Sequence, residues 1–128
     1  MSQLGFLRRL QVKPVPDQER LDRIQKTCAA IVDVLSPKEI YLFGSALSCE
    51  TFDEESDIDC LAVLGSDAEA SRWWKNFGKI RRQLVWLLDL VCLSEHEFSR
   101  KKNLGGVAFV AYHEGVLIYS VSSKILGP

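Results

Sequence analysis

The spacing of apolar residues predicts a long helix that begins at Asp17 and ends at Ser36-Pro37. Its apolar positions recur at i, i+3, i+4 and i+7, the period of a helix with one buried face: Leu21, Ile24, Cys28, Ile31, Val32 and Leu35. Proline cannot continue a helix, so Pro37 marks its end. Residues 1–16 finish in Lys-Pro-Val-Pro, and we expect them to form a short arm before a single domain over residues 17–128.

Short apolar runs predict strands at residues 39–43, 57–64, 84–93 and 116–120. The run 84–93 is apolar on both faces, so we expect a central strand that is covered on both sides. Further helices are expected over residues 67–82, from Ser94 towards Lys102, and for about two turns before the last strand. This order predicts an α/β (α+β) fold, in which helices pack on a small mixed β-sheet.

The composition is that of an ordinary soluble protein: 128 residues, 47% apolar, 26% charged, with a net charge of -1. This balance argues against a general polyanion binder, so a nucleic-acid partner is not expected. Two helical faces are nevertheless basic, the first with Arg72, Lys75, Lys79 and Arg82, the second with Arg100, Lys101 and Lys102. Such faces suit a partner's surface, and solvated helix surface explains them equally well.

Cysteine usage and apolar run lengths predict a cytoplasmic protein that has no membrane partner. The four cysteines are scattered and form neither a CxxC pair nor a metal-ligand spacing with histidine: Cys28, Cys49, Cys60 and Cys92. Free thiols in a reducing compartment are therefore expected. The run 84–93 is too short to cross a bilayer, and the opening residues lack the apolar core of a secretory leader.

Asp57 and Asp59 stand two residues apart on a predicted strand, so both side chains leave the same face of the sheet. Neighbouring carboxylates repel each other unless one takes up a proton or a cation bridges them. Mg²⁺ prefers such oxygen ligands and keeps waters and substrate phosphates in its remaining positions. A solvated acidic strand start is the alternative, because Asp53-Glu-Glu55 precedes the pair.

Asp89 interrupts the most apolar stretch of the chain. An ionised carboxylate is costly there unless it is paired, bound to a metal or placed at a solvent-exposed edge of the sheet. A hydrogen-bonded structural aspartate is the alternative. If the strands 57–64 and 84–93 are neighbours about 4.8 Å apart, Asp89 joins Asp57 and Asp59 in one cluster.

Gly44-Ser45 directly follows a predicted strand and precedes a helical turn. Glycine permits close approach of the backbone, and N–H groups at a helix start suit a phosphate. A lone dipeptide of this kind is more often a simple turn. Neither the P-loop motif nor the dinucleotide-binding glycine motif is present.

Together these motifs resemble the DNA-polymerase-β-type nucleotidyltransferase superfamily, and specifically its minimal nucleotidyltransferases. The resemblance covers roughly residues 17–120 and rests on Phe43-Gly44-Ser45, Asp57-Ile58-Asp59-Cys60, Leu88-Asp89-Leu90 and the closing segment 114–119. It implies Mg²⁺-dependent transfer of a nucleoside monophosphate, with ATP as the expected donor. By resemblance, Gly44 and Ser45 would grip the triphosphate and Asp57 and Asp59 would hold two Mg²⁺ ions. Asp89 would ligate one ion and help to activate an acceptor hydroxyl.

Minimal proteins of this family are often antitoxins that pair with a helical HEPN toxin and adenylylate it. The resemblance therefore implies a partner protein of that type as one acceptor. The loop Ala46–Glu50 lacks the Arg-x-Arg-Gly that often follows the Gly-Ser in the family. The alternative function is thus a catalytically weak or inactive module that binds nucleotide and neutralises a partner toxin by binding.

Overall fold

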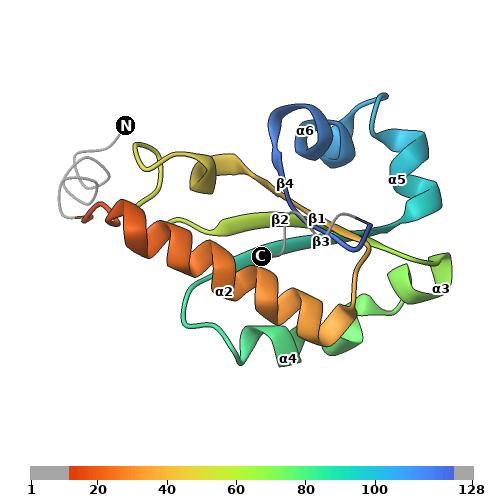
Figure 1. Cartoon of the computed structure of the whole chain (residues 1–128), viewed down its shortest axis with the longest axis horizontal. Helices are drawn as coiled ribbons and strands as arrows, with labels where there is room; N and C mark the ends of the chain where they lie inside the picture. The colour runs from red at the N-terminus through yellow and green to blue at the C-terminus, as the bar shows by residue number, and fades with distance from the viewer. Residues whose placement is uncertain (1–11, 123–128) are drawn as a thin grey trace, which may run out of the picture.

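A mixed four-stranded sheet organises residues 12–122, the part of the chain that the computed structural model describes (Figure 1). The elements are, in chain order, α2 (Asp17–Leu35), β1 (Glu39–Phe43), the 3₁₀ helix η1 (Gly44–Leu47), β2 (Ile58–Leu64), α3 (Asp67–Ala70), the 3₁₀ helix η2 (Trp73–Asn76), α4 (Phe77–Arg81), β3 (Leu88–Ser94), α5 (Glu95–Lys101), α6 (Gly106–Glu114) and β4 (Val116–Ser120). The strand order is β3-β2-β1-β4, with β2 and β3 parallel and the other pairs antiparallel. This confirms the predicted α+β fold with a mixed sheet.

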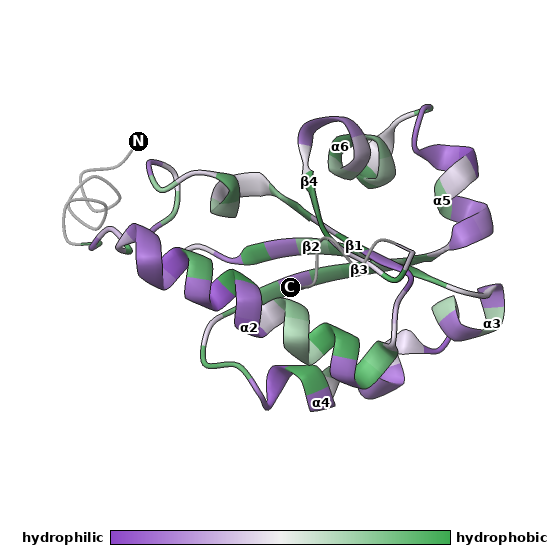
Figure 2. Cartoon of the chain, viewed as in Figure 1, coloured by the Kyte–Doolittle hydropathy of each residue, from purple (hydrophilic) through white to green (hydrophobic). Residues whose placement is uncertain are grey.

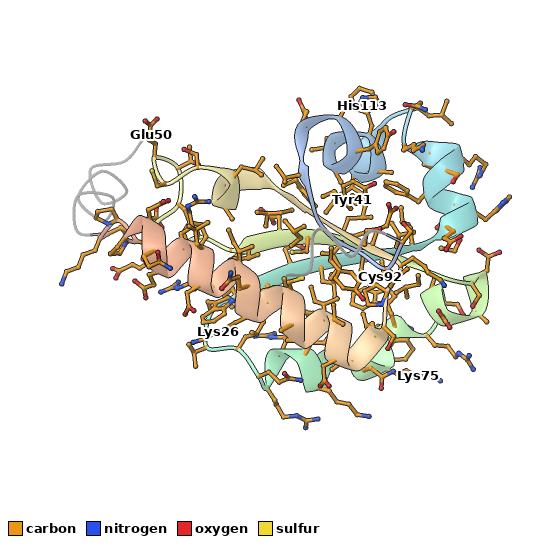
Figure 3. The ribbon with its side chains drawn as sticks, in the orientation of Figure 1. Lys26, Tyr41, Glu50, Lys75, Cys92 and His113 are labelled. Carbon is orange, nitrogen blue, oxygen red and sulfur yellow. The ribbon has the colours of Figure 1, made fainter. Side chains whose placement is uncertain are left out.

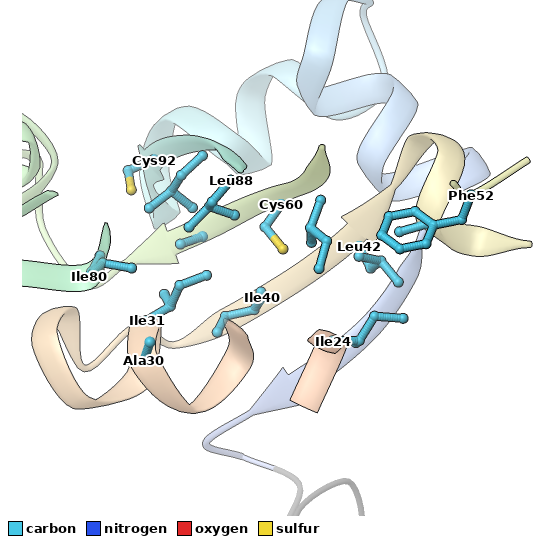
Figure 4. Close-up of a cluster of buried hydrophobic side chains, with 14 of the residues drawn as sticks. Ile24, Ala30, Ile31, Ile40, Leu42, Phe52, Cys60, Ile80, Leu88 and Cys92 are labelled. Carbon is cyan, nitrogen blue, oxygen red and sulfur yellow. The ribbon is translucent and has the colours of Figure 1, made fainter. Parts of the chain in front are cut away.

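Helices cover both faces of the sheet and leave apolar strands between them (Figure 2). The larger core lies on the side of α2 and α4, where Ile31 of α2 and Ile80 of α4 face Ile40, Cys60 and Leu88 of the strands (Figure 4). A smaller core lies under α5 and α6 on the other face. Two layers of helices on one sheet give even this short chain a substantial buried interior.

The predicted first helix is confirmed over residues 17–35. It ends where Ser36 adopts a left-handed conformation, with φ 47°, and donates its N–H to the Val32 carbonyl. The helix start predicted at Ser94 is also confirmed, because the Ser94 hydroxyl accepts a hydrogen bond from the Glu97 N–H at 3.1 Å. Both ends are set by neighbours in the sequence, which explains why local pattern was sufficient.

The continuous helix predicted over residues 67–82 is wrong, since the structure breaks this stretch into α3, η2 and α4. The Ser71 hydroxyl donates to the Ala68 carbonyl at 2.8 Å and so competes with the helical hydrogen-bond ladder. The 3₁₀ turn that follows lets Trp73 pack on the larger core, where its ring meets Phe77 edge-on at 5.5 Å. Packing of a partly buried tryptophan on the core thus outweighs helical continuity here.

The central strand predicted over residues 84–93 is also wrong in position and extent. β3 begins only at Leu88 and is an edge strand of the sheet, which it enters after a loop at residues 84–87. The Trp86 indole N–H donates to the Thr27 hydroxyl at 2.8 Å, and the Arg23 guanidinium lies 5.5 Å from the Trp86 ring centroid. Because these contacts hold residues 84–87 against α2, this part of the apolar run does not join the sheet as an extension of β3.

The residues just before α2 pack against the domain. Pro14 forms an antiparallel bridge with Asp53, and Val15 is buried in the larger core. All four cysteines are free, as expected, with Cys60 and Cys92 buried. None of the helices within residues 12–122 is long and apolar enough to cross a membrane.

Candidate active site

Strand register brings the predicted site residues to one end of the sheet. Asp59 of β2 is paired with Phe43, the last residue of β1, on one side and with Asp89 of β3 on the other. Gly44 follows Phe43 directly, and Asp57 immediately precedes β2. Asp59 therefore stands between the Gly44-Ser45 turn and Asp89, two regions that are distant in the sequence.

Gly44 has two physical reasons to be glycine. Its φ of 76° lies in the left-handed region, which costs a residue with a Cβ roughly 1–2 kcal/mol. A Cβ at this position would also collide with the Asp59 carboxylate and would lie 3.1 Å from its Cγ. The turn and the central aspartate are thus in direct contact, which a simple turn does not require.

Two side chains hold η1 in place after the turn. The Thr51 hydroxyl donates to the Ser45 carbonyl at 2.7 Å, and the Arg20 guanidinium donates to the Ala46 carbonyl at 2.6 Å. Arg20 is also ion-paired with Asp17 at 2.8 Å. Sequence reasoning missed both supports, because neither residue lies in a motif and only the fold brings α2 beside η1.

Asp59 has the most perturbed carboxyl group of the site. Partial burial, the charges of Asp89 and Asp57, and a side-chain hydrogen bond with Asp89 together raise the pKa of Asp59 to about 6. Burial contributes most, because removal from water disfavours the charged form. Two carboxylates that share a hydrogen bond in this way need either a proton or a cation between them.

Asp89 itself is exposed to solvent, although it lies in an apolar stretch. Of the three situations expected to make a carboxylate tolerable in this stretch, the structure shows a solvent-exposed edge of the sheet. β3 is an edge strand, and alternate residues of β3 face the larger core while Asp89 points to the other face of the sheet. The partly buried member of the cluster is Asp59, on the inner strand β2.

The donor set suits a hard divalent cation. Mg²⁺ prefers carboxylate oxygens, and neutralisation by a cation would relieve the repulsion that raises the pKa of Asp59. Within residues 12–122, however, no three His, Cys, Asp or Glu side chains converge closely enough to form a ready-made metal site. Asp57, Asp59 and Asp89 therefore match Mg²⁺ by chemistry and proximity, and binding would require their side chains to rearrange.

Comparisons with known proteins agree with the fold. The family model for the nucleotidyltransferase domain matches residues 21–124. A crystal structure of a presumed nucleotidyltransferase from Sulfolobus solfataricus superposes with a TM-score of 0.54 at 21% sequence identity. That likeness covers 83% of this chain and 87% of the other, and at this identity it supports the fold alone. No curated protein matches the chain.

Proposed function

The chain belongs to the nucleotidyltransferase domain family, and we propose that it transfers the nucleoside monophosphate of ATP to an acceptor hydroxyl with the help of Mg²⁺. The observation that carries this proposal is the cluster of Asp57, Asp59 and Asp89 in contact with the Gly44-Ser45 turn. A simple turn or an isolated acidic strand would not need this contact. The turn and the aspartate cluster together, at one end of the sheet, suit a triphosphate and its cation.

Each residue has a distinct proposed role. Gly44 and Ser45 bind the triphosphate through the backbone at the start of η1, where the absence of a side chain at position 44 allows close approach. Asp57 and Asp59 hold Mg²⁺. Bound Mg²⁺ would neutralise charge on the triphosphate and lower the pKa of the attacking hydroxyl. Asp89 accepts the hydroxyl proton while the hydroxyl oxygen bonds to the α-phosphorus and pyrophosphate leaves.

The exposed surroundings of Asp89 favour a large acceptor. Asp89 is solvent-exposed on an edge strand, so a hydroxyl carried by a macromolecule can reach it. The preceding loop presents two apolar side chains to solvent, Val85 at 97% and Leu87 at 54% exposure. Exposed apolar groups beside a site suit a protein surface. We therefore propose a hydroxyl of a partner protein as acceptor, with a HEPN-type toxin as the first candidate.

The test is transfer of label from ATP to candidate partner proteins in the presence of Mg²⁺. Label at the α-phosphate should appear on the acceptor, and label at the γ-phosphate should not, because pyrophosphate departs. The double variant Asp57→Asn/Asp59→Asn should lose at least about 100-fold in rate. Undiminished α-label transfer by that variant would refute the proposed roles of the two aspartates.

A second candidate function is a nucleotide-binding module that neutralises its partner without turnover. The observation in its favour is the lack of free positive charge for a triphosphate at the start of η1. The Arg20 guanidinium, which contacts η1, is already engaged by the Ala46 carbonyl and by Asp17. Residues 46–50 contain no basic residue. Mg²⁺-dependent ATP binding without any label transfer would support this alternative.

A further inference from the structure

Five cations and no carboxylate occur between Glu69 and Asp89, and all five lie in residues 72–82, here called the basic segment: Arg72, Lys75, Lys79, Arg81 and Arg82. Each of them is exposed. Since the net charge of the chain is -1, the +5 of the basic segment leaves -6 for the remainder. Positive charge is therefore concentrated on η2 and α4, where nitrogen-tipped side chains, Lys75 among them, project into solvent (Figure 3).

These charges are not neutralised within the described part of the chain. None of the five cations forms an ion pair with a carboxylate of residues 12–122. Arg72 donates to the Ala68 carbonyl and Arg81 lies over the Phe77 ring, and neither contact removes charge. The basic face of α5 differs, because Lys101 pairs with Glu97 at 3.3 Å. The two basic faces thus differ in how far carboxylates of the same element neutralise them.

An aromatic side chain accompanies the free charge. Trp74 is 63% exposed, and the Lys75 ammonium lies 5.8 Å from its ring centroid. Lys75 also lines a hollow of about 480 Å³, together with Val34, Leu35, Leu64, Arg72, Trp73 and Asn76. Glu69, the carboxylate in this lining, accepts a hydrogen bond from the Gly65 N–H. The lining thus combines apolar side chains with two cations, Arg72 and Lys75.

We propose that the basic segment and Trp74 form a docking surface for single-stranded nucleic acid. Free cations suit successive phosphates, and an exposed indole provides a stacking platform for an unpaired base. An acidic protein surface would match the charge as well, and the competition with polyglutamate described below distinguishes the two. Base pairs of a duplex are already stacked, so the single strand is the favoured form. A nucleic-acid partner was not expected from the net charge of the chain. The net charge sums the positive basic segment with the negative remainder and so conceals the local positive charge.

This surface is separate from the aspartate cluster. Leu64, which lines the hollow, lies at the opposite end of β2 from Asp59, about 16 Å away at the rise of a strand. The inference therefore does not depend on nucleotidyl transfer. The transfer-deficient variant Asp57→Asn/Asp59→Asn should bind nucleic acid as the wild type does.

The experiment measures fluorescence anisotropy of a labelled oligouridylate of about 12 nucleotides, titrated with the full chain at several salt concentrations. We expect binding that weakens steeply with salt. Lys75→Glu/Lys79→Glu/Arg82→Glu should lower affinity at least about 10-fold. The matched variant Arg100→Glu/Lys101→Glu/Lys102→Glu, which reverses the same number of charges at the end of α5, should change it less than about 3-fold. Trp74→Ala, which keeps every charge, should lower affinity about five-fold or more.

Three results would overturn the proposal. The first is no binding at low salt. The second is equal loss of affinity in the basic-segment variant and the α5 variant, which would indicate a general charge effect. The third is competition by polyglutamate as effective as by unlabelled oligonucleotide together with full binding by Trp74→Ala, which would identify an acidic protein surface as the partner. Thermal unfolding of each variant confirms that the variants remain folded.

Discussion

Asp59 contributes to the packing of the fold and to the proposed chemistry of the site. It belongs to the inner strand β2, touches Gly44 on one side and shares a hydrogen bond with Asp89 on the other. Its partial burial and two like-charged neighbours make its ionised form costly in the absence of a cation. The same features that prepare it to hold a cation therefore lower the stability of the cation-free protein.

The substitution Asp59→Asn should stabilise the protein in EDTA at pH 8. Because folding raises the pKa of Asp59 to about 6, the folded state binds the proton more tightly, and stability is lost as the pH rises from about 4 through 6. An amide removes this loss, which we expect to be about 1 kcal/mol after solvent screening is allowed for. Urea unfolding at pH 4 and pH 8 measures it.

Asp22→Asn, at an exposed ion pair with Lys26, is the control and should not become more stable at pH 8. If Asp59→Asn were no more stable than the wild type at pH 8, the cost of ionising Asp59 in the folded protein would be refuted.

The substitution Gly44→Ala should destabilise the protein by about 2 kcal/mol or more and remove transfer activity. The left-handed φ and the collision with the Asp59 carboxylate both oppose a methyl group at this position. Gly78→Ala is the matched control, because a Cβ there meets no atom within 4 Å and lies inside α4. That change should stabilise by about 0.5–1 kcal/mol. Equal effects of the two substitutions in urea unfolding would contradict this account.

Among the elements, the loop at residues 84–87 sets where β3 begins and hence where Asp89 lies. Trp86 anchors this loop to the fully buried Thr27 of α2, while the flanking Val85 and Leu87 remain exposed. The carbonyl of Leu87 also accepts a hydrogen bond from the Ile58 N–H at 3.0 Å, next to Asp57. Position of the edge strand thus depends on a contact between residues far apart in the sequence.

The substitution Thr27→Val should therefore weaken both stability and transfer. It leaves the Trp86 N–H without its acceptor in a partly buried place, at a cost of about 1–2 kcal/mol. Thr27→Ser keeps the hydroxyl and is the control, expected to retain the hydrogen bond and the transfer rate. Unfolding and label transfer measured on both variants decide the matter, and a Val variant as active as the Ser variant would disprove the anchoring role.

Elements whose limits depend on adjacent residues were predictable, and those that depend on distant contacts were not. The helix at residues 17–35 and the start of α5 at Ser94 follow from periodicity and capping, and both are confirmed. The start of β3 was missed because Trp86 is held by Thr27, and the break after α3 was missed because Trp73 packs on the core. No local pattern encodes either contact.

The site divides in the same way. The strand register brings Asp59 beside Asp89 and next to the Gly44-Ser45 turn. Sequence spacing put Asp57 and Asp59 on one face of a strand and joined Asp89 to them on the condition that the two strands are neighbours. It could not identify which aspartate is partly buried, because apolar neighbours in sequence do not reveal an edge strand. It also gave no signal for Arg20 and Thr51, whose support of η1 arises only from the folded arrangement.

At the scale of the whole molecule, the proposed ligands should stabilise the folded chain. Mg²⁺ and ATP together are expected to raise the melting temperature by about 5 °C or more at saturating concentration, because they bind only the folded site. The variant Asp57→Asn/Asp59→Asn should show no such rise, and ATP in EDTA should have little effect on either protein. A rise of the same size in both proteins would place nucleotide binding elsewhere.

The contact between Gly44 and Asp59 constrains the order in which these two residues can be replaced during evolution. A side chain at position 44 displaces the Asp59 carboxylate for as long as position 59 keeps it, and it faces the unfavourable φ in either case. Substitutions at the two positions are therefore ordered: a lineage that abandons catalysis can lose the aspartate first, and only later the glycine. Among relatives, loss of Gly44 with Asp59 retained should be the rarest combination. A lineage that keeps Gly44 but has lost Asp59 would have lost its catalytic activity recently, while its backbone still has the conformation of the active enzyme.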